Sequence, residues 1–215
     1  MRTTFLATAG LSLACVSFAA SPSDIGLYNT GIAPGSYSLV SGPSGAAFGL
    51  YEPSKVYSGW VANETNSQWL AIYSGITAPA STVSVPNVSS GAYTIKYTFD
   101  LGSYKASDVS FGISAAVDGQ YSSVTLNGQT LANTTGTVPG NSYGYFGYGY
   151  SVNGTASGLQ NGLNTLVFTV TNGSNAAGLN VRYTDFAAIP EPSTYAAMLA
   201  CATLALVVWR RRANR

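Results

Sequence analysis

The sequence contains no histidine, and it has only two cysteines, one near each end. Without histidine the chain cannot form a Ser–His or Cys–His catalytic pair, nor an HExxH zinc site. Cys15 and Cys201 both fall in apolar end segments, so the central domain has neither a disulfide nor a thiolate metal site. These absences exclude the familiar histidine-dependent nucleophilic enzymes and the zinc proteases.

Charged residues are also scarce, at 8 % of the chain, where about a quarter is typical. Five of the nine basic residues lie in the end segments, as Arg2, Arg210, Arg211, Arg212 and Arg215. The central residues 21–188 keep four basic and seven acidic side chains, a net charge of −3. A mildly acidic domain without a basic stripe argues against nucleic acid as a partner.

What the chain does have is 24 glycines, 15 tyrosines and many Ser, Thr and Asn residues. Such a composition favours short strands joined by Gly and Asn turns over helices. Apolar residues alternate along 93–99 and 109–117, and 124–126 and 129–131 flank Asn127-Gly128, a preferred type I′ hairpin pair. Further strands are expected at 36–40, 56–61, 68–73, 82–85, 166–170 and 179–183. We therefore predict an all-β domain over 21–188, folded as an antiparallel β-sandwich.

The first 20 residues have the layout of a secretory signal. A positive start at Arg2 precedes an apolar stretch over 5–20, and polar residues follow from Ser21. Ser17-Phe18-Ala19 fits the rule of small residues before a cleavage site. The sequence therefore predicts a signal helix over 1–20 that is removed during export.

The last 27 residues, 189–215, divide into three parts. Pro190-Glu191-Pro192 is followed by an uncharged apolar run over 195–209 and then by an arginine cluster. Each proline lacks a donor and restricts the residue before it, so we expect this motif to be extended and exposed, outside helix and sheet. Fifteen residues of helix cover roughly 22 Å, against a hydrocarbon core of about 30 Å. Snorkelling of Arg210, Arg211 and Arg212 on the cytoplasmic side could help to close that gap.

This order of motif, apolar helix and arginines at the C-terminus resembles the PEP-CTERM sorting signal. The family commonly has Val at the position of Ile189. The resemblance implies that Pro190, Glu191 and Pro192 are recognised by exosortase, a membrane-embedded cysteine protease, after passage through the secretion machinery. It also implies a transient stay in the inner membrane of a Gram-negative bacterium that makes exopolysaccharide. The mature protein would then lie at the cell surface or in the biofilm matrix.

A second resemblance covers residues 56–186. The strand Gly91 to Leu101, the hairpin Val124 to Gly128 and the turn Gly162-Leu-Asn164 look like those of galactose-binding-like and carbohydrate-binding modules. This likeness implies a jelly-roll arrangement of the sandwich. It says more about fold than about a ligand.

Five aromatic residues could stack on sugar rings: Trp60, Trp69, Tyr143, Tyr145 and Tyr148. The tryptophans could equally fill the core. The stretch 143–150, with its alternating Tyr and Gly, could be an exposed aromatic surface or a glycine-weakened edge strand. Nothing in the spacing pairs the acids for glycoside hydrolysis, and we expect Asp100, Asp108 and Asp118 to be solvated turn residues.

No cofactor is predicted, although backbone carbonyls could help to form a structural calcium site. The sequence thus favours a non-catalytic, exported surface or matrix protein that binds extracellular polysaccharide or serves a structural role. Two alternatives stay open. One is a secreted glycan-active enzyme that uses carboxylates, and the other is an adhesive module without a specific ligand.

Overall fold

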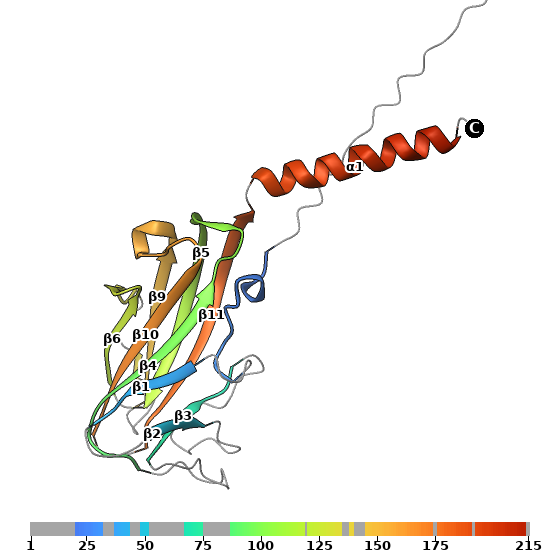
Figure 1. Ribbon diagram of the computed structural model, residues 1–215. Coiled ribbons are helices and arrows are strands. Elements are labelled where there is room, and N and C mark those ends of the chain that lie inside the picture. The colour runs from blue at the N-terminus through green and yellow to red at the C-terminus, as the bar shows by residue number, and fades with distance from the viewer. Residues whose placement is uncertain are drawn as a thin grey trace, which may run out of the picture.

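The computed structural model describes residues 20–31, 37–43, 48–51, 67–74, 87–118, 120–134, 138–139, 145–173, 176–190 and 192–213. Figure 1 shows two antiparallel sheets packed as a sandwich, with one long helix leaving its end. The β-sandwich predicted from the sequence is confirmed. Residues 1–19 of the signal segment expected over 1–20, and the expected strands 56–61 and 82–85, lie outside the described residues.

The described strands form a five-stranded and a six-stranded sheet. The five-stranded sheet has the order β1 (Tyr37–Ser41), β4 (Gly91–Asp100), β10 (Leu163–Asn172), β6 (Gln120–Leu126) and β7 (Gln129–Thr130). The six-stranded sheet has the order β2 (Phe48–Tyr51), β3 (Leu70–Ser74), β11 (Gly178–Pro190), β5 (Tyr104–Asp118), β9 (Tyr145–Asn153) and β8 (Val138–Pro139). Two short 3₁₀ helices, η1 (Pro22–Ile25) and η2 (Gly154–Ser157), and the helix α1 (Pro192–Ala213) complete the described elements.

The core lies between the sheets and follows the alternation seen in the sequence. All four alternating apolar residues of β4, from Tyr93 to Phe99, are buried, as are the five over 109–117 in β5. β10 pairs with β4 along its whole length, from Leu163 opposite Asp100 to Asn172 opposite Gly91. This register places Leu166, Phe168 and Val170 on the core side. Burial of each such side chain contributes about 1.5–3 kcal/mol.

The hairpin at Asn127-Gly128 is confirmed, and a hydrogen-bond network holds it in place. Asn127 and Gly128 have φ of +50° and +85°, the left-handed values that the turn requires. The Asn127 side chain donates to the Asn164 Oδ1 atom at 2.7 Å, and its own Oδ1 accepts from the Thr165 backbone N–H at 2.8 Å. The hairpin motif and the Gly-Leu-Asn turn, recognised separately in the sequence, are therefore direct partners.

Candidate functional site

The Pro-Glu-Pro motif lies at the junction between the last strand and the helix. Pro190 is the last residue of β11 and pairs with Tyr104 of β5, while Pro192 is the first residue of α1. The expectation that the motif lies outside helix and sheet is thus wrong for its two prolines. Proline is accepted at both places, because a strand end and a first helical turn need no donor from its nitrogen. Glu191 lies outside the described residues.

A β-bulge interrupts β11 shortly before this junction. Thr184 pairs with Gly112 and Ala187 pairs with Ser110, so two residues of β11 oppose one residue of β5. Within the bulge Asp185 has φ of +51°, a left-handed conformation that Asp tolerates better than most residues. Gly112 allows the Thr184 side chain to lie close to the backbone of β5, because a Cβ atom at residue 112 would lie 2.3 Å from the Thr184 Oγ1 atom.

The N-terminal segment over residues 27–31 runs beside β11, before the bulge. The Thr30 backbone N–H donates to the Val181 carbonyl, and the Val181 N–H donates to the Thr30 Oγ1 atom, both at 3.0 Å. The Tyr183 N–H donates to the Asn29 Oδ1 atom at 2.7 Å. The start of the folded domain therefore stabilises the strand that carries the C-terminal motif, an association that no sequence pattern indicated.

A cluster of buried tyrosines fixes the same N-terminal segment to the core. The Tyr28 N–H donates to the Tyr97 hydroxyl at 2.6 Å, and the Tyr97 hydroxyl in turn donates to the Gly26 carbonyl. The hydroxyls of Tyr37 and Tyr183 lie 3.1 Å apart in hydrogen-bond contact. Burial raises the pKa of Tyr97 to about 12 and raises the pKa of Tyr183 well above its ordinary value. Both rings therefore stay neutral, and can donate, at every ordinary pH.

Helix α1 projects from the end of the sandwich, as Figure 1 shows. Its described side chains from Leu199 to Ala213 are all exposed, including Leu204 at 67 % and Trp209 at 68 %. Arg210, Arg211 and Arg212 occupy the last turn, where cations complement the helix dipole. Within the described part of the chain, no helix combines the length and the hydropathy needed to cross a membrane.

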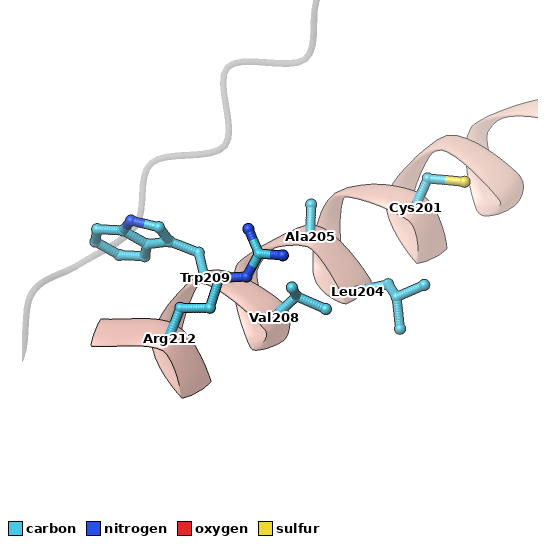
Figure 2. Close-up of a pocket in the computed structure, with 6 residues that line it drawn as sticks. All are labelled: Cys201, Leu204, Ala205, Val208, Trp209 and Arg212. Carbon is cyan, nitrogen blue, oxygen red and sulfur yellow. The ribbon is translucent and has the colours of Figure 1, made fainter. Parts of the chain in front are cut away.

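One stripe of α1 is hollowed between its own side chains. Figure 2 shows six described residues that line this hollow, and these six come from the helix: Cys201, Leu204, Ala205, Val208, Trp209 and Arg212. Five of the six are apolar, and the arginine lies at the C-terminal end. The surface suits an apolar environment with a polar boundary at the arginines.

Of the five aromatic residues proposed to stack on sugars, three lie among the described residues. Trp69 has no exposed surface and packs with Ala71 and Ala176 in a small second cluster, so its ring is not available to a ligand in this structure. Tyr145 and Tyr148 lie in β9, opposite Asp118 and Ala115 of β5. Trp60 and Tyr143 lie outside the described residues. Glycan stacking at Trp60, Tyr143, Tyr145 and Tyr148 stays a prediction.

The aspartates lie in different settings from those expected. Asp100 is exposed, as expected, but it is the last residue of β4, and its Oδ1 atom accepts from the Gly102 N–H of the following turn at 2.8 Å. Asp108 and Asp118 instead lie within β5, and Asp118 is buried, so the expectation of solvated turn residues is wrong for both. Among the described residues, no group of three or more His, Cys, Asp or Glu side chains could hold a metal ion.

Comparison with protein-family models, curated proteins and solved structures found no match. The chain's own residues are therefore the basis for assigning a function. The candidate site is the junction at which β11 ends in Pro190 and α1 begins. The bulge and the N-terminal segment fix the position of β11 in the sheet.

Proposed function

We propose that this protein is an exported bacterial envelope or matrix protein whose C-terminal residues 189–215 are a sorting signal for a protease of the exosortase type. The observation that carries the proposal is the exposure of α1. A folded sandwich buries its own apolar residues, yet Leu204, Val208 and Trp209 of α1 are exposed and do not belong to the core formed by the described residues. Such a helix needs an apolar environment outside the domain.

The inner membrane is the environment that we propose for α1. The apolar run over 195–209 is short of an ordinary span, which suits a temporary hold better than a permanent anchor. The stems of the exposed terminal arginines could lie along apolar surface while their guanidinium groups stay in water. The positive-inside rule then places these arginines in the cytoplasm and the sandwich outside. The signal segment over 1–20 supports the same direction of export.

We further propose that the sandwich is a jelly roll. In that fold eight consecutive strands form two sheets with the orders 1-8-3-6 and 2-7-4-5, as two Greek keys. Counting β3 as the first strand and leaving out β8, the orders β3-β11-β5-β9 and β4-β10-β6-β7 follow this scheme. The strands β1, β2 and β8 are then additions at the edges. This order supports the likeness to carbohydrate-binding modules, and it leaves the ligand open.

We propose a non-catalytic role at the surface or in the matrix, with polysaccharide as the candidate ligand. Three aspartates support a non-catalytic role, because each accepts a hydrogen bond from a residue close to it in the sequence. Asp24, Asp100 and Asp108 accept hydrogen bonds from Ser21, Gly102 and Ser107 respectively. A glycan-active enzyme that uses carboxylates remains the alternative. It would lose activity in an Asp-to-Asn variant of its catalytic pair.

The test of sorting is the intact mass and location of the native protein in a host with the protease. We expect a mature form that begins near residue 20 and ends near residue 190. Glu191→Ala should stay uncleaved in the inner membrane, whereas Asp100→Ala, an exposed acid at the end of β4, should still be cleaved. A wild-type protein that keeps its full C-terminus would refute the sorting proposal.

A further inference from the structure

The terminal segment of β11, residues 187–190, is held less firmly than the rest of the strand. From Gly178 to Thr184 the strand pairs residue by residue with β5, and β3 and the N-terminal segment bond to its other edge. Beyond the bulge the pairs are Ala187 with Ser110, Ala188 with Val109 and Pro190 with Tyr104, with a further irregularity between the last two. Among the described residues, this segment has no backbone partner on its other edge.

The described side chains of this segment, those of Ala187 to Ile189, add little to its attachment. Ala187 is exposed, Ala188 is half-buried, and Ile189 is 63 % exposed. By contrast, Leu179 and Val181 have no exposed surface, and Tyr183 is also buried. Chain ends with few buried contacts open at a small fraction of the global free energy of unfolding. The terminal segment can therefore separate from β5 while the body of β11 stays in the sheet.

Separation of this segment has a consequence for the Pro-Glu-Pro motif. Pro190 belongs to the sheet, and only Glu191 stands between it and α1, so no linker presents the motif to another protein. Recognition of an extended segment commonly uses its main-chain groups and alternate side chains, and both must be accessible. Without separation, the sandwich would obstruct one side of the motif.

We infer that residues 187–190 are a detachable strand end, and that their release from β5 as far as the Asp185 bulge is required before the motif can be processed. This inference rests on the proposed sorting function. It means that the pairing between β5 and β11 controls when the motif is processed. The bulge limits the release, because the strand before it is bonded on both edges and its side chains belong to the core. The domain can thus present its motif without unfolding.

The test is to staple the segment to its partner. Ser110 and Ala187 are paired in the register, and replacing both with cysteine should allow a disulfide, with Cys201→Ser removing the exposed native thiol. In the full chain and its native host, we expect pulse-chase processing to slow by about tenfold or more when the staple is oxidised. A reducing agent should restore the wild-type rate. As a second variant, Gly-Ser-Gly inserted between Ile189 and Pro190 should speed processing.

The matched control is a staple of the same kind elsewhere. Thr98 and Thr165 are paired between β4 and β10, and Thr98→Cys with Thr165→Cys should leave the rate unchanged. Formation of each staple is checked by mass after alkylation. A Ser110–Ala187 staple that forms but is processed at the wild-type rate would overturn the inference, as would an insertion without effect. If the wild-type chain itself is never processed, the proposed sorting function fails first, which is a different result.

Discussion

Asn164 should be among the side chains most sensitive to substitution. It has no exposed surface, and both ends of its amide are bonded. Its Oδ1 atom accepts from the Gln160 N–H at 2.9 Å and from the Asn127 side chain at 2.7 Å. Its Nδ2 atom donates to the carbonyls of Gln160 at 2.8 Å and Gly162 at 2.7 Å. This amide therefore fixes the turn before β10 and connects it to the hairpin.

Asn164→Asp keeps the shape of the side chain and removes only the two donated bonds. Each net hydrogen bond contributes about 1 kcal/mol, and burying a carboxylate beside two carbonyl oxygens adds a desolvation cost of its own. We therefore expect a loss of about 2–4 kcal/mol in the free energy of unfolding at pH 7. Two carbonyls close to the new carboxylate, together with burial, should raise its pKa above the unfolded value of about 3.9. The loss should therefore be smaller at pH 4, where a protonated oxygen can still donate.

Urea unfolding of the purified protein, followed by tyrosine and tryptophan fluorescence, measures this loss at both pH values. Asn153→Asp is the matched control, because that side chain is exposed, and its effect should stay within about 0.5 kcal/mol. A loss below about 0.5 kcal/mol for Asn164→Asp, or a loss that does not depend on pH, would refute this reasoning. A double-mutant cycle with Asn127→Ala would measure the coupling between the two turns.

Three further predictions concern the last strand and its supports. Tyr97→Phe removes the hydroxyl that bonds the N-terminal segment and should lower stability by about 1–3 kcal/mol in the same unfolding assay. Gly112→Ala should be destabilising, since its Cβ would lie 2.3 Å from the Thr184 Oγ1 atom, and Thr184→Ala should restore part of the lost melting temperature. Stability should also fall from about pH 10 to pH 12, because unfolded tyrosine ionises near 10, while burial raises the pKa of Tyr97 to about 12. Tyr97→Phe should reduce that fall, and a wild-type melting temperature that stays constant over this interval would contradict the assignment.

The alternation of apolar residues was sufficient to predict the central strands. Each residue on the apolar side of 93–99 is buried, because one face of an exposed sheet must cover the core. The turn signal at Asn127-Gly128 was equally reliable, since few residue pairs accept two left-handed positions. These are local properties, and a single sequence records them directly.

Contacts between residues that are distant in the sequence could not be predicted in this way. Thr30 and Val181 are separated by 151 residues, and no sequence pattern around either residue indicates that the two are in contact. The bulge at Asp185 depends on Gly112 in another strand, so the pattern of β11 alone could not reveal it. The prediction for the two prolines of the Pro-Glu-Pro motif was wrong for a related reason. Their restrictions exclude the interior of helix and sheet, but the ends of both elements remain allowed.

The position of β11 in the sheet connects folding with the C-terminal motif. β11 lies between β3 and β5 and also bonds the N-terminal segment, so the six-stranded sheet cannot close before the last residues of the domain are available. Contacts between such distant residues form late, because the entropy of closing a long loop must be overcome first. The strand that completes the sandwich is thus the same strand that continues into Pro190 and α1. An unfolded chain would leave the whole strand free, whereas the folded domain leaves only its terminal segment weakly held. This difference would allow the proposed processing to depend on whether the domain is folded.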